Sequence, residues 1–187
     1  MRAHFFTLAN QLTLLRLALI PFFVLAILEG NRALALGLFV AAGVSDALDG
    51  LLARLLNQRT TFGAYFDPIA DKLLLSTAFV ILALQGLLPW TLAILVVGRD
   101  VLIVVIAGVI ILATGYRPFP PSRSGKACTV VETATVFAVL LANVFLLRWL
   151  PGIRDFLFWL TAALVLASGL QYALRVGKMM PDLHPKN

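Results

Sequence analysis

Residues 46–71 read DALDGLLARLLNQRTTFGAYFDPIAD, a stretch in which four aspartates stand between two long apolar runs. The first run extends from about Ala33 to Leu56 and the second from about Gly63 to Leu84, with the polar residues 57–61 between them. About 20 apolar residues in a helix are enough to cross a membrane. The stretch therefore predicts two antiparallel transmembrane helices, joined by a short polar turn, with the aspartates near the joined ends.

The composition of the whole chain also indicates a membrane protein. Of the 187 residues, 61% are hydrophobic and only 13% are charged, about half the ~25% that is usual in soluble domains. A soluble protein of this size exposes a large part of its residues to water and cannot hide so many apolar side chains. The composition excludes a soluble globular domain and a disordered chain, and it favours a polytopic membrane protein.

We predict an all-α fold with six transmembrane helices in a single domain that covers residues 1–187. Polar stretches separate the apolar runs, and the most loop-like of them, 114–124, contains three prolines. The pair Pro151-Gly152 is read as a further break before the last helix. The helices are expected at 12–28, 33–56, 63–84, 90–113, 126–147 and 156–176.

The basic residues predict the orientation in the membrane. Six spans place both termini on one side, and that side carries nine cations: Arg2, Arg54, Arg59, Arg117, Arg123, Lys126, Arg175, Lys178 and Lys186. The opposite side carries three, Arg32, Arg148 and Arg154. Because cytoplasmic loops are rich in Lys and Arg, both termini are predicted to be cytoplasmic. We attribute the net charge of +6 to these loops and to anionic lipid, and we expect no nucleic-acid partner.

Acidic residues inside apolar runs need compensation, since each intramembrane charge costs at least ~2.5–3.5 kcal/mol on insertion. Asp46 and Asp49 are three residues apart and Asp67 and Asp71 are four apart, so each pair shares one face of its helix. The four carboxylates can converge at one depth, and the nearby basic residues do not neutralise them all. We predict one or two oxygen-ligated divalent cations, Mg²⁺ or Mn²⁺ rather than Zn²⁺, because no His or Cys is nearby.

The same stretch resembles the signature of the CDP-alcohol phosphatidyltransferases, D-x2-D-G-x2-A-R-x8-G-x3-D-x3-D, and matches it at every fixed position. The segment 10–16, NQLTLLR, together with Pro21, is similar to the opening of the phosphatidylglycerophosphate synthase and cardiolipin synthase branch. The six expected helices resemble the core of that family.

The resemblance implies an enzyme of phospholipid biosynthesis. Members of the family transfer a phosphatidyl group from CDP-diacylglycerol to an alcohol and release CMP. By resemblance, two divalent ions are held by Asp46, Asp49, Asp67 and Asp71. Asp71 is also the candidate general base for the attacking hydroxyl. The positions that the resemblance assigns to the CDP pocket are Asp49, Gly50, Ala53, Arg54 and Gly63.

Further polar residues predict where the alcohol acceptor binds, and these are Asn10, Thr13, Arg16, Arg99, Lys126 and Thr129. Arg99 and Lys126 favour an acceptor that carries a phosphate, which indicates glycerol 3-phosphate. The segment from Gly125 to Thr129 resembles the Gly-Lys-x-x-Thr segment of phosphatidylglycerophosphate synthases. Arg99-Asp100 stands where those enzymes usually have Arg-Glu, and it is more similar to the cardiolipin synthases, which use phosphatidylglycerol.

Several alternatives stay open on the residues alone. Arg99 and Asp100 can form a purely structural ion pair, because charges so deep in a membrane usually find partners. Inositol phosphate is a further acceptor, although no feature favours it. A small transporter would also bury acids, but it would show inverted repeats, and we find none. We expect the protein in the bacterial plasma (inner) membrane with its active site facing the cytoplasm, and the resemblance implies a homodimer.

Overall fold

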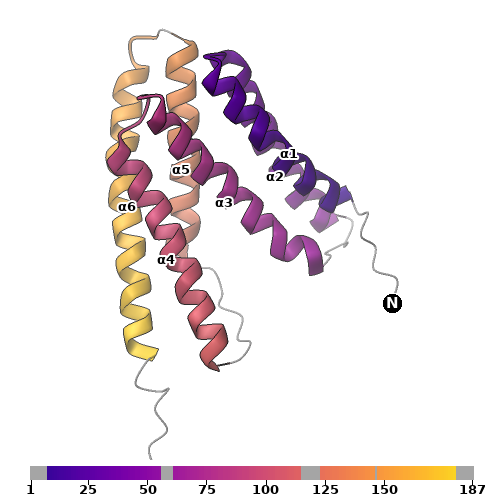
Figure 1. The fold of residues 1–187 in the computed structure, drawn as a ribbon, viewed down its shortest axis with the longest axis vertical. Coiled ribbons are helices and arrows are strands. Elements are labelled where there is room, and N and C mark those ends of the chain that lie inside the picture. The colour runs from indigo at the N-terminus through magenta and orange to yellow at the C-terminus, as the bar shows by residue number, and fades with distance from the viewer. Residues whose placement is uncertain (1–7, 56–60, 115–122, 146, 180–187) are drawn as a thin grey trace, which may run out of the picture.

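The computed structural model describes residues 8–55, 61–114, 123–145 and 147–179, and it defines side chains for 14–48, 70–105, 125–145, 147–172 and 174. The described residues form six helices and no strand, as the sequence predicts. The helices are α1 (Leu8–Leu28), α2 (Arg32–Leu55), α3 (Thr61–Leu84), α4 (Trp90–Thr114), α5 (Arg123–Val144) and α6 (Leu150–Met179) (Figure 1).

A break precedes the last helix as predicted, but it lies earlier in the sequence than expected. The sixth helix was expected to begin near Phe156, but α6 begins at Leu150 and includes Pro151 and Gly152 in its first turn. Proline is tolerated there because the first backbone N–H groups of a helix have no partner within it, and its fixed φ suits helix entry. Pro151 therefore begins α6 instead of separating it from α5.

Two glycines end helices at the same end of the molecule. Gly30 and Gly86 have φ of 72° and 69° and follow α1 and α3. After Gly30, the N–H of Asn31 donates to the Ala26 carbonyl over 2.9 Å, and this bond satisfies a carbonyl at the helix end. Asn31 Oδ1 then accepts from the Leu34 N–H over 3.1 Å and caps α2. The chain thus reverses sharply, so α1 and α2 lie antiparallel and side by side.

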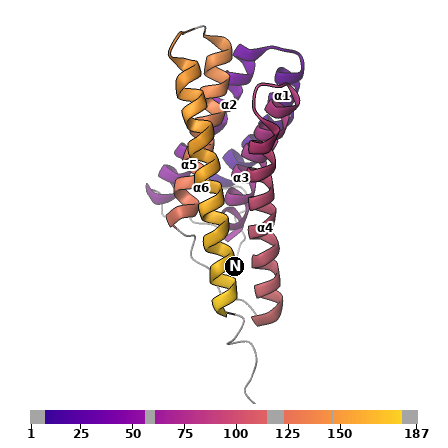
Figure 2. The ribbon, with the colours of Figure 1, turned by 90° about the vertical axis from the view of Figure 1, so that its left-hand side faces the viewer.

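Packing between the helices forms a closed ring, which runs in the order α1, α2, α5, α6, α4, α3 and back to α1. Helix α3 also contacts α5 across the ring. The views in Figure 1 and Figure 2 show that the α1–α2, α3–α4 and α5–α6 connections share one end, and that α1 begins and α6 ends at the other. Helices that are distant in sequence, such as α2 and α5, are therefore neighbours.

The outer surface is rich in large apolar side chains, and several charged side chains are buried beside the hydrophobic core. Large apolar residues such as Phe22, Ile94 and Trp159 are exposed at 60%, 65% and 79%. The buried polar and charged residues, by contrast, are Arg16, Ser45, Arg99, Asp100, Glu132, Thr135, Thr161 and Ser168. Small residues including Ala35 and Ala78 fill the helix contacts, as they do where membrane helices pack closely. The outer surface suits lipid, and several of the buried polar groups pair with one another, as Thr135 does with Thr161 over 2.7 Å.

Two stretches among the described side chains are long and apolar enough to cross a membrane, Gly125–Val144 in α5 and Leu150–Tyr172 in α6. A shorter apolar stretch, Leu14–Leu28, lies in α1. These stretches agree with the membrane protein that the composition predicts.

We predict that Ala78→Leu lowers the thermal unfolding temperature in detergent micelles, because Ala78 is fully buried in the core and overpacking costs about 1–3 kcal/mol. The matched control is Val104→Leu, since Val104 is 62% exposed on the apolar outer surface. Equal unfolding temperatures for the two variants would contradict the packing described here.

Candidate functional site

A cavity of about 630 Å³ opens beside α2 and α5. Among the described side chains, those that line it belong to α1, α2, α3 and α5. Val44 and Val130 line it and are 52% and 67% exposed at the molecular surface. The cavity therefore opens sideways between α2 and α5, toward the apolar surroundings. The described part of its lining is mostly apolar, and the charged residues in that part are Arg16, Asp46 and Asp71.

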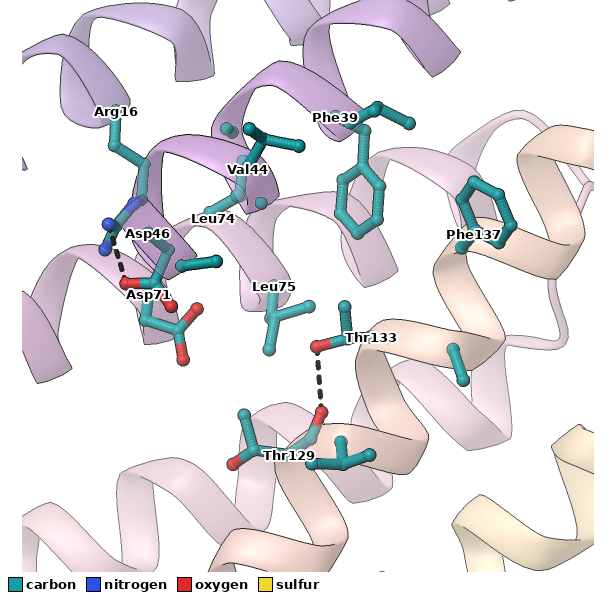
Figure 3. A pocket seen from close by; sticks show the side chains of 16 residues that line it. Arg16, Phe39, Val44, Asp46, Asp71, Leu74, Leu75, Thr129, Thr133 and Phe137 are labelled. Atoms are coloured by element: carbon teal, nitrogen blue, oxygen red, sulfur yellow. Dashed lines mark hydrogen bonds and ion pairs between the residues drawn. The ribbon is translucent and has the colours of Figure 1, made fainter. Parts of the chain in front are cut away.

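An ion pair forms one side of this charged region. Arg16 Nη2 in α1 lies 2.6 Å from Asp46 Oδ1 in α2 (Figure 3). The Arg16 side chain is 1% exposed, whereas the Asp46 side chain is 49% exposed. The guanidinium therefore supports the carboxylate from the protein interior and leaves its other side open to the cavity. Sequence analysis predicted Arg16 at a phosphate or acceptor site, and it did not identify Asp46 as a partner.

The carboxylate of Asp71 lies next to Asp46 and points into the cavity from α3 (Figure 3). Asp46 and Asp71 are the first and last residues of the 46–71 stretch, so these two predicted ligands come together at one place. The other two, Asp49 and Asp67, belong to the helical backbones of α2 and α3, and their side chains lie outside the described residues.

Thr129 faces this region from α5, on the opposite wall of the cavity (Figure 3). Its hydroxyl donates to the Gly125 carbonyl over 3.2 Å, and the Thr133 hydroxyl donates to the Thr129 carbonyl over 2.9 Å. Because both protons go to the helix backbone, the two hydroxyl oxygens are left to accept hydrogen bonds from a ligand. Thr133 also lines the cavity and was missed in the sequence, although it lies one turn after Thr129.

For the other predicted site residues, the structure gives only the position of the backbone. These residues belong to the predicted CDP pocket and to the predicted acceptor site at the start of α1. The backbone assigns Gly50, Ala53 and Arg54 to the last turns of α2 and Gly63 to the first turn of α3. Asn10 and Thr13 belong to the start of α1. The side chains of all six lie outside the described residues, so their roles stay predictions.

The two carboxylates that line the charged end of this cavity fit a hard divalent cation. Asp46 and Asp71 supply only oxygen donors, which suit Mg²⁺ or Mn²⁺. Among the described side chains, no group of three or more His, Cys, Asp or Glu residues is arranged to hold a metal ion. A complete site therefore depends on Asp49 and Asp67, whose helix positions are known but whose side chains are not described.

Arg99 belongs to a separate buried network behind the cavity. Its Nη1 lies 2.8 Å from Asp100 Oδ1 and 3.4 Å from Glu132 Oε1, and its Nη2 donates to Ser168 Oγ over 3.4 Å. The Arg99 side chain is 5% exposed and does not line the cavity. These contacts match the structural alternative for Arg99, while its predicted acceptor role stays untested. Lys126 is exposed at the start of α5 and also lies outside the cavity lining.

Comparison with known proteins agrees with the resemblance. Residues 6–167 match the family model described as CDP-alcohol phosphatidyltransferase. A protein of Bacillus subtilis named CDP-diacylglycerol–glycerol-3-phosphate 3-phosphatidyltransferase is 32% identical over 183 residues, which cover 89% of this chain and 93% of that protein. The family predicted from the 46–71 stretch is thus confirmed.

Other relatives are longer than this chain. The Mycobacterium tuberculosis protein named "Probable phosphatidylglycerophosphate synthase" is 38% identical over 141 residues, covering 72% of this chain and 66% of that protein. The human protein named cardiolipin synthase (CMP-forming) is 32% identical over 187 residues, covering 89% of this chain and 60% of that protein. The chain thus spans slightly less than two thirds of these relatives.

We predict that Arg99→Met destabilises the protein strongly, because it leaves Asp100 and Glu132 buried with less positive charge. Removing one partner of a buried ion pair costs about 3–5 kcal/mol. The matched control is Arg154→Met, which removes the cation of the more exposed Arg154–Asp155 pair and should cost about 0–1 kcal/mol. Thermal unfolding in micelles measures both, and a larger loss in Arg154→Met would refute the assignment.

Proposed function

Because the chain belongs to the CDP-alcohol phosphatidyltransferase family, we propose that it transfers a phosphatidyl group from CDP-diacylglycerol to the hydroxyl of glycerol 3-phosphate and releases CMP. One observation carries this proposal. Asp46 and Asp71, the two ends of the family motif, meet at the charged end of a cavity whose remaining walls are mostly apolar. Such a cavity suits a substrate that has a charged head and lipid tails.

The helix lengths support the membrane arrangement in this proposal. The shortest helix, α1, has 21 residues, which corresponds to a length of about 31 Å at 1.5 Å per residue and to a hydrocarbon core of about 30 Å. We propose that all six helices span the bacterial inner membrane and that both termini are cytoplasmic. Arg32, Arg148 and Arg154 lie toward the other end, where cations are few. In this proposal the charged end of the cavity lies toward the cytoplasmic side.

The residues have distinct proposed roles in the transfer. The acyl chains of CDP-diacylglycerol lie along the lateral opening between α2 and α5, and the pyrophosphate reaches Asp46 and Asp71. Asp46, Asp49, Asp67 and Asp71 would hold two divalent ions, which neutralise charge on the phosphates when bound. Arg54 is proposed to bind the CDP phosphates, together with the small residues Gly50, Ala53 and Gly63 and with Asp49.

In the proposed step, the acceptor oxygen forms a bond to the phosphorus that carries diacylglycerol. The bond from that phosphorus to the oxygen of CMP breaks, and CMP leaves with the bonding electrons. The proton of the acceptor hydroxyl passes to the Asp71 carboxylate. Thr129 and Thr133 face this point from α5 and can accept hydrogen bonds from the acceptor.

The identity of the acceptor rests on the relatives and on the cations. The Bacillus subtilis relative, of which the chain covers 93%, is named for glycerol 3-phosphate. Lys126, exposed at the start of α5, is available to the acceptor phosphate. The second candidate is phosphatidylglycerol, because the human relative is named cardiolipin synthase and because Arg99-Asp100 resembles that branch. The family resemblance also supports a homodimer, which light scattering in micelles would test.

The function is tested by incubating the purified protein with CDP-diacylglycerol in the presence of Mg²⁺ and measuring the release of CMP. Glycerol 3-phosphate, phosphatidylglycerol and inositol 1-phosphate are offered one at a time. We expect release with glycerol 3-phosphate. Release with phosphatidylglycerol alone would establish cardiolipin synthesis instead, and no release with any acceptor would contradict the proposed activity.

Two substitutions test the roles of the carboxylates. Asp71→Asn should reduce turnover by at least about 100-fold, the scale of general-base catalysis, while CDP-diacylglycerol still binds. Asp46→Asn should raise the Mg²⁺ concentration needed for half-maximal activity. The matched control is Asp155→Asn, which removes an exposed carboxylate at the other end and should leave the activity unchanged. Near-normal turnover in Asp71→Asn would defeat the assignment of the base.

A further inference from the structure

A chain of charged contacts crosses the protein behind the cavity. Lys72 Nζ in α3 lies 2.5 Å from Asp100 Oδ1 in α4, and the same oxygen lies 2.8 Å from Arg99 Nη1. Arg99 Nη1 in turn lies 3.4 Å from Glu132 Oε1 in α5. The chain holds two cations and two anions, so its formal charges cancel.

The two ends of this series of charged contacts lie beside the charged part of the cavity, one in α3 and the other in α5. Lys72 directly follows Asp71 in α3, and Glu132 lies between Thr129 and Thr133 in α5. Asp71, Thr129 and Thr133 line the cavity, whereas Lys72 and Glu132 do not. Lys72 instead lines a smaller apolar cavity of about 280 Å³ together with Asp100. Lys72 and Glu132 therefore lie behind the walls of the larger cavity and do not line it.

Helix α4 connects these two walls although none of its described side chains lines the larger cavity. It packs against α3 and α6, and its Arg99 and Asp100 reach toward both α3 and α5. The cavity occupies part of the space between α3 and α5, so direct packing between these two helices is limited. The series of charged contacts from Lys72 to Glu132 supplies a connection of defined length between α3 and α5.

Stability alone does not account for four ionisable groups at this place. Well-packed apolar residues of similar volume often stabilise a protein as much as a buried ion pair does. An ion pair with short contacts, however, permits one register between two helices, whereas apolar surfaces slide more easily. The charges are therefore better explained by the geometry that they impose than by the free energy that they add.

We propose that Lys72 is a positioning residue for Asp71. Held by Asp100, it fixes α3 against α4, and through Arg99 and Glu132 it fixes α3 against α5. Asp71 is thereby held at a fixed distance from the hydroxyls of Thr129 and Thr133. The acceptor is proposed to lie between Asp71 and these two hydroxyls. This inference rests on the proposed phosphatidyl transfer.

The test compares the kinetics of Lys72→Met and Lys72→Arg in the CMP-release assay. Because Lys72 does not line the donor cavity, Lys72→Met should lower kcat about 10-fold, or about 1.4 kcal/mol in the barrier, with the KM for CDP-diacylglycerol within two-fold. Lys72→Arg retains a cation that can bind Asp100, and it should recover most of the lost kcat. The unfolding temperature of each variant is measured to confirm that it is folded.

Three results would overturn the inference. One is an unchanged kcat in folded Lys72→Met, and another is a loss that appears mainly in KM. The third is a Lys72→Arg variant no more active than Lys72→Met. If Lys72→Met does not fold, Asp100→Asn keeps the shape of the side chain while removing its charge, and it should lower kcat with the same unchanged KM. An unchanged kcat in folded Asp100→Asn would then be decisive against the proposal.

Measurements on a control variant and on the wild-type protein show whether a negative result contradicts this inference alone or the proposed function as well. Asp155→Asn breaks an exposed ion pair with Arg154 and should leave kcat unchanged. If the wild-type protein releases no CMP with any acceptor, the proposed function fails and the positioning inference fails with it. If the wild-type protein is active and the Lys72 variants match it, only the positioning inference fails.

Discussion

Charge neutralisation inside an apolar medium is the constraint on which the arrangement of these helices depends. A charged side chain that water cannot reach needs a partner within the protein, because no other solvent supplies one. Arg16 meets Asp46 across α1 and α2, and Lys72 meets Asp100 across α3 and α4. Each of these contacts joins two helices that are consecutive or adjacent in the ring. The ion pairs thus add polar contacts between helices that already pack side by side, and the apolar contacts add close packing.

The two sets of charges differ in what they leave exposed. In the network around Arg99, the side chains of Arg99, Asp100 and Glu132 are 5%, 10% and 2% exposed and pair with one another, while Lys72 at its edge is 35% exposed. In the pair at the cavity, the Asp46 side chain is 49% exposed although its partner Arg16 is buried. Buried charges that pair with one another suit a structural connection. A carboxylate that stays partly exposed suits a site that binds ions or phosphates. This difference separates the two roles more clearly than residue type does.

Much of the fold could be predicted from the sequence, because apolar runs and turn residues are local signals. The six helices and the meeting of Asp46 with Asp71 followed from run length and from three- and four-residue spacing. The start of α6 was missed because a proline ends a helix or begins one, depending on its neighbours. The pairing of Lys72 with Asp100 was also missed. Spacing along one helix shows which residues share a face, but it does not show which other helix that face meets.

The lateral opening of the cavity has a consequence for how such a protein would encounter its donor. Val44 and Val130 line the opening and are exposed on the outer surface, so a lipid would arrive by diffusion in the plane of the bilayer and would not first pass through water. Occupancy of the site would then follow the mole fraction of that lipid in the membrane. Diluting the membrane in buffer would leave occupancy unchanged, whereas adding inert phospholipid would lower it. In that arrangement, the composition of the bilayer itself would control the rate of the proposed reaction.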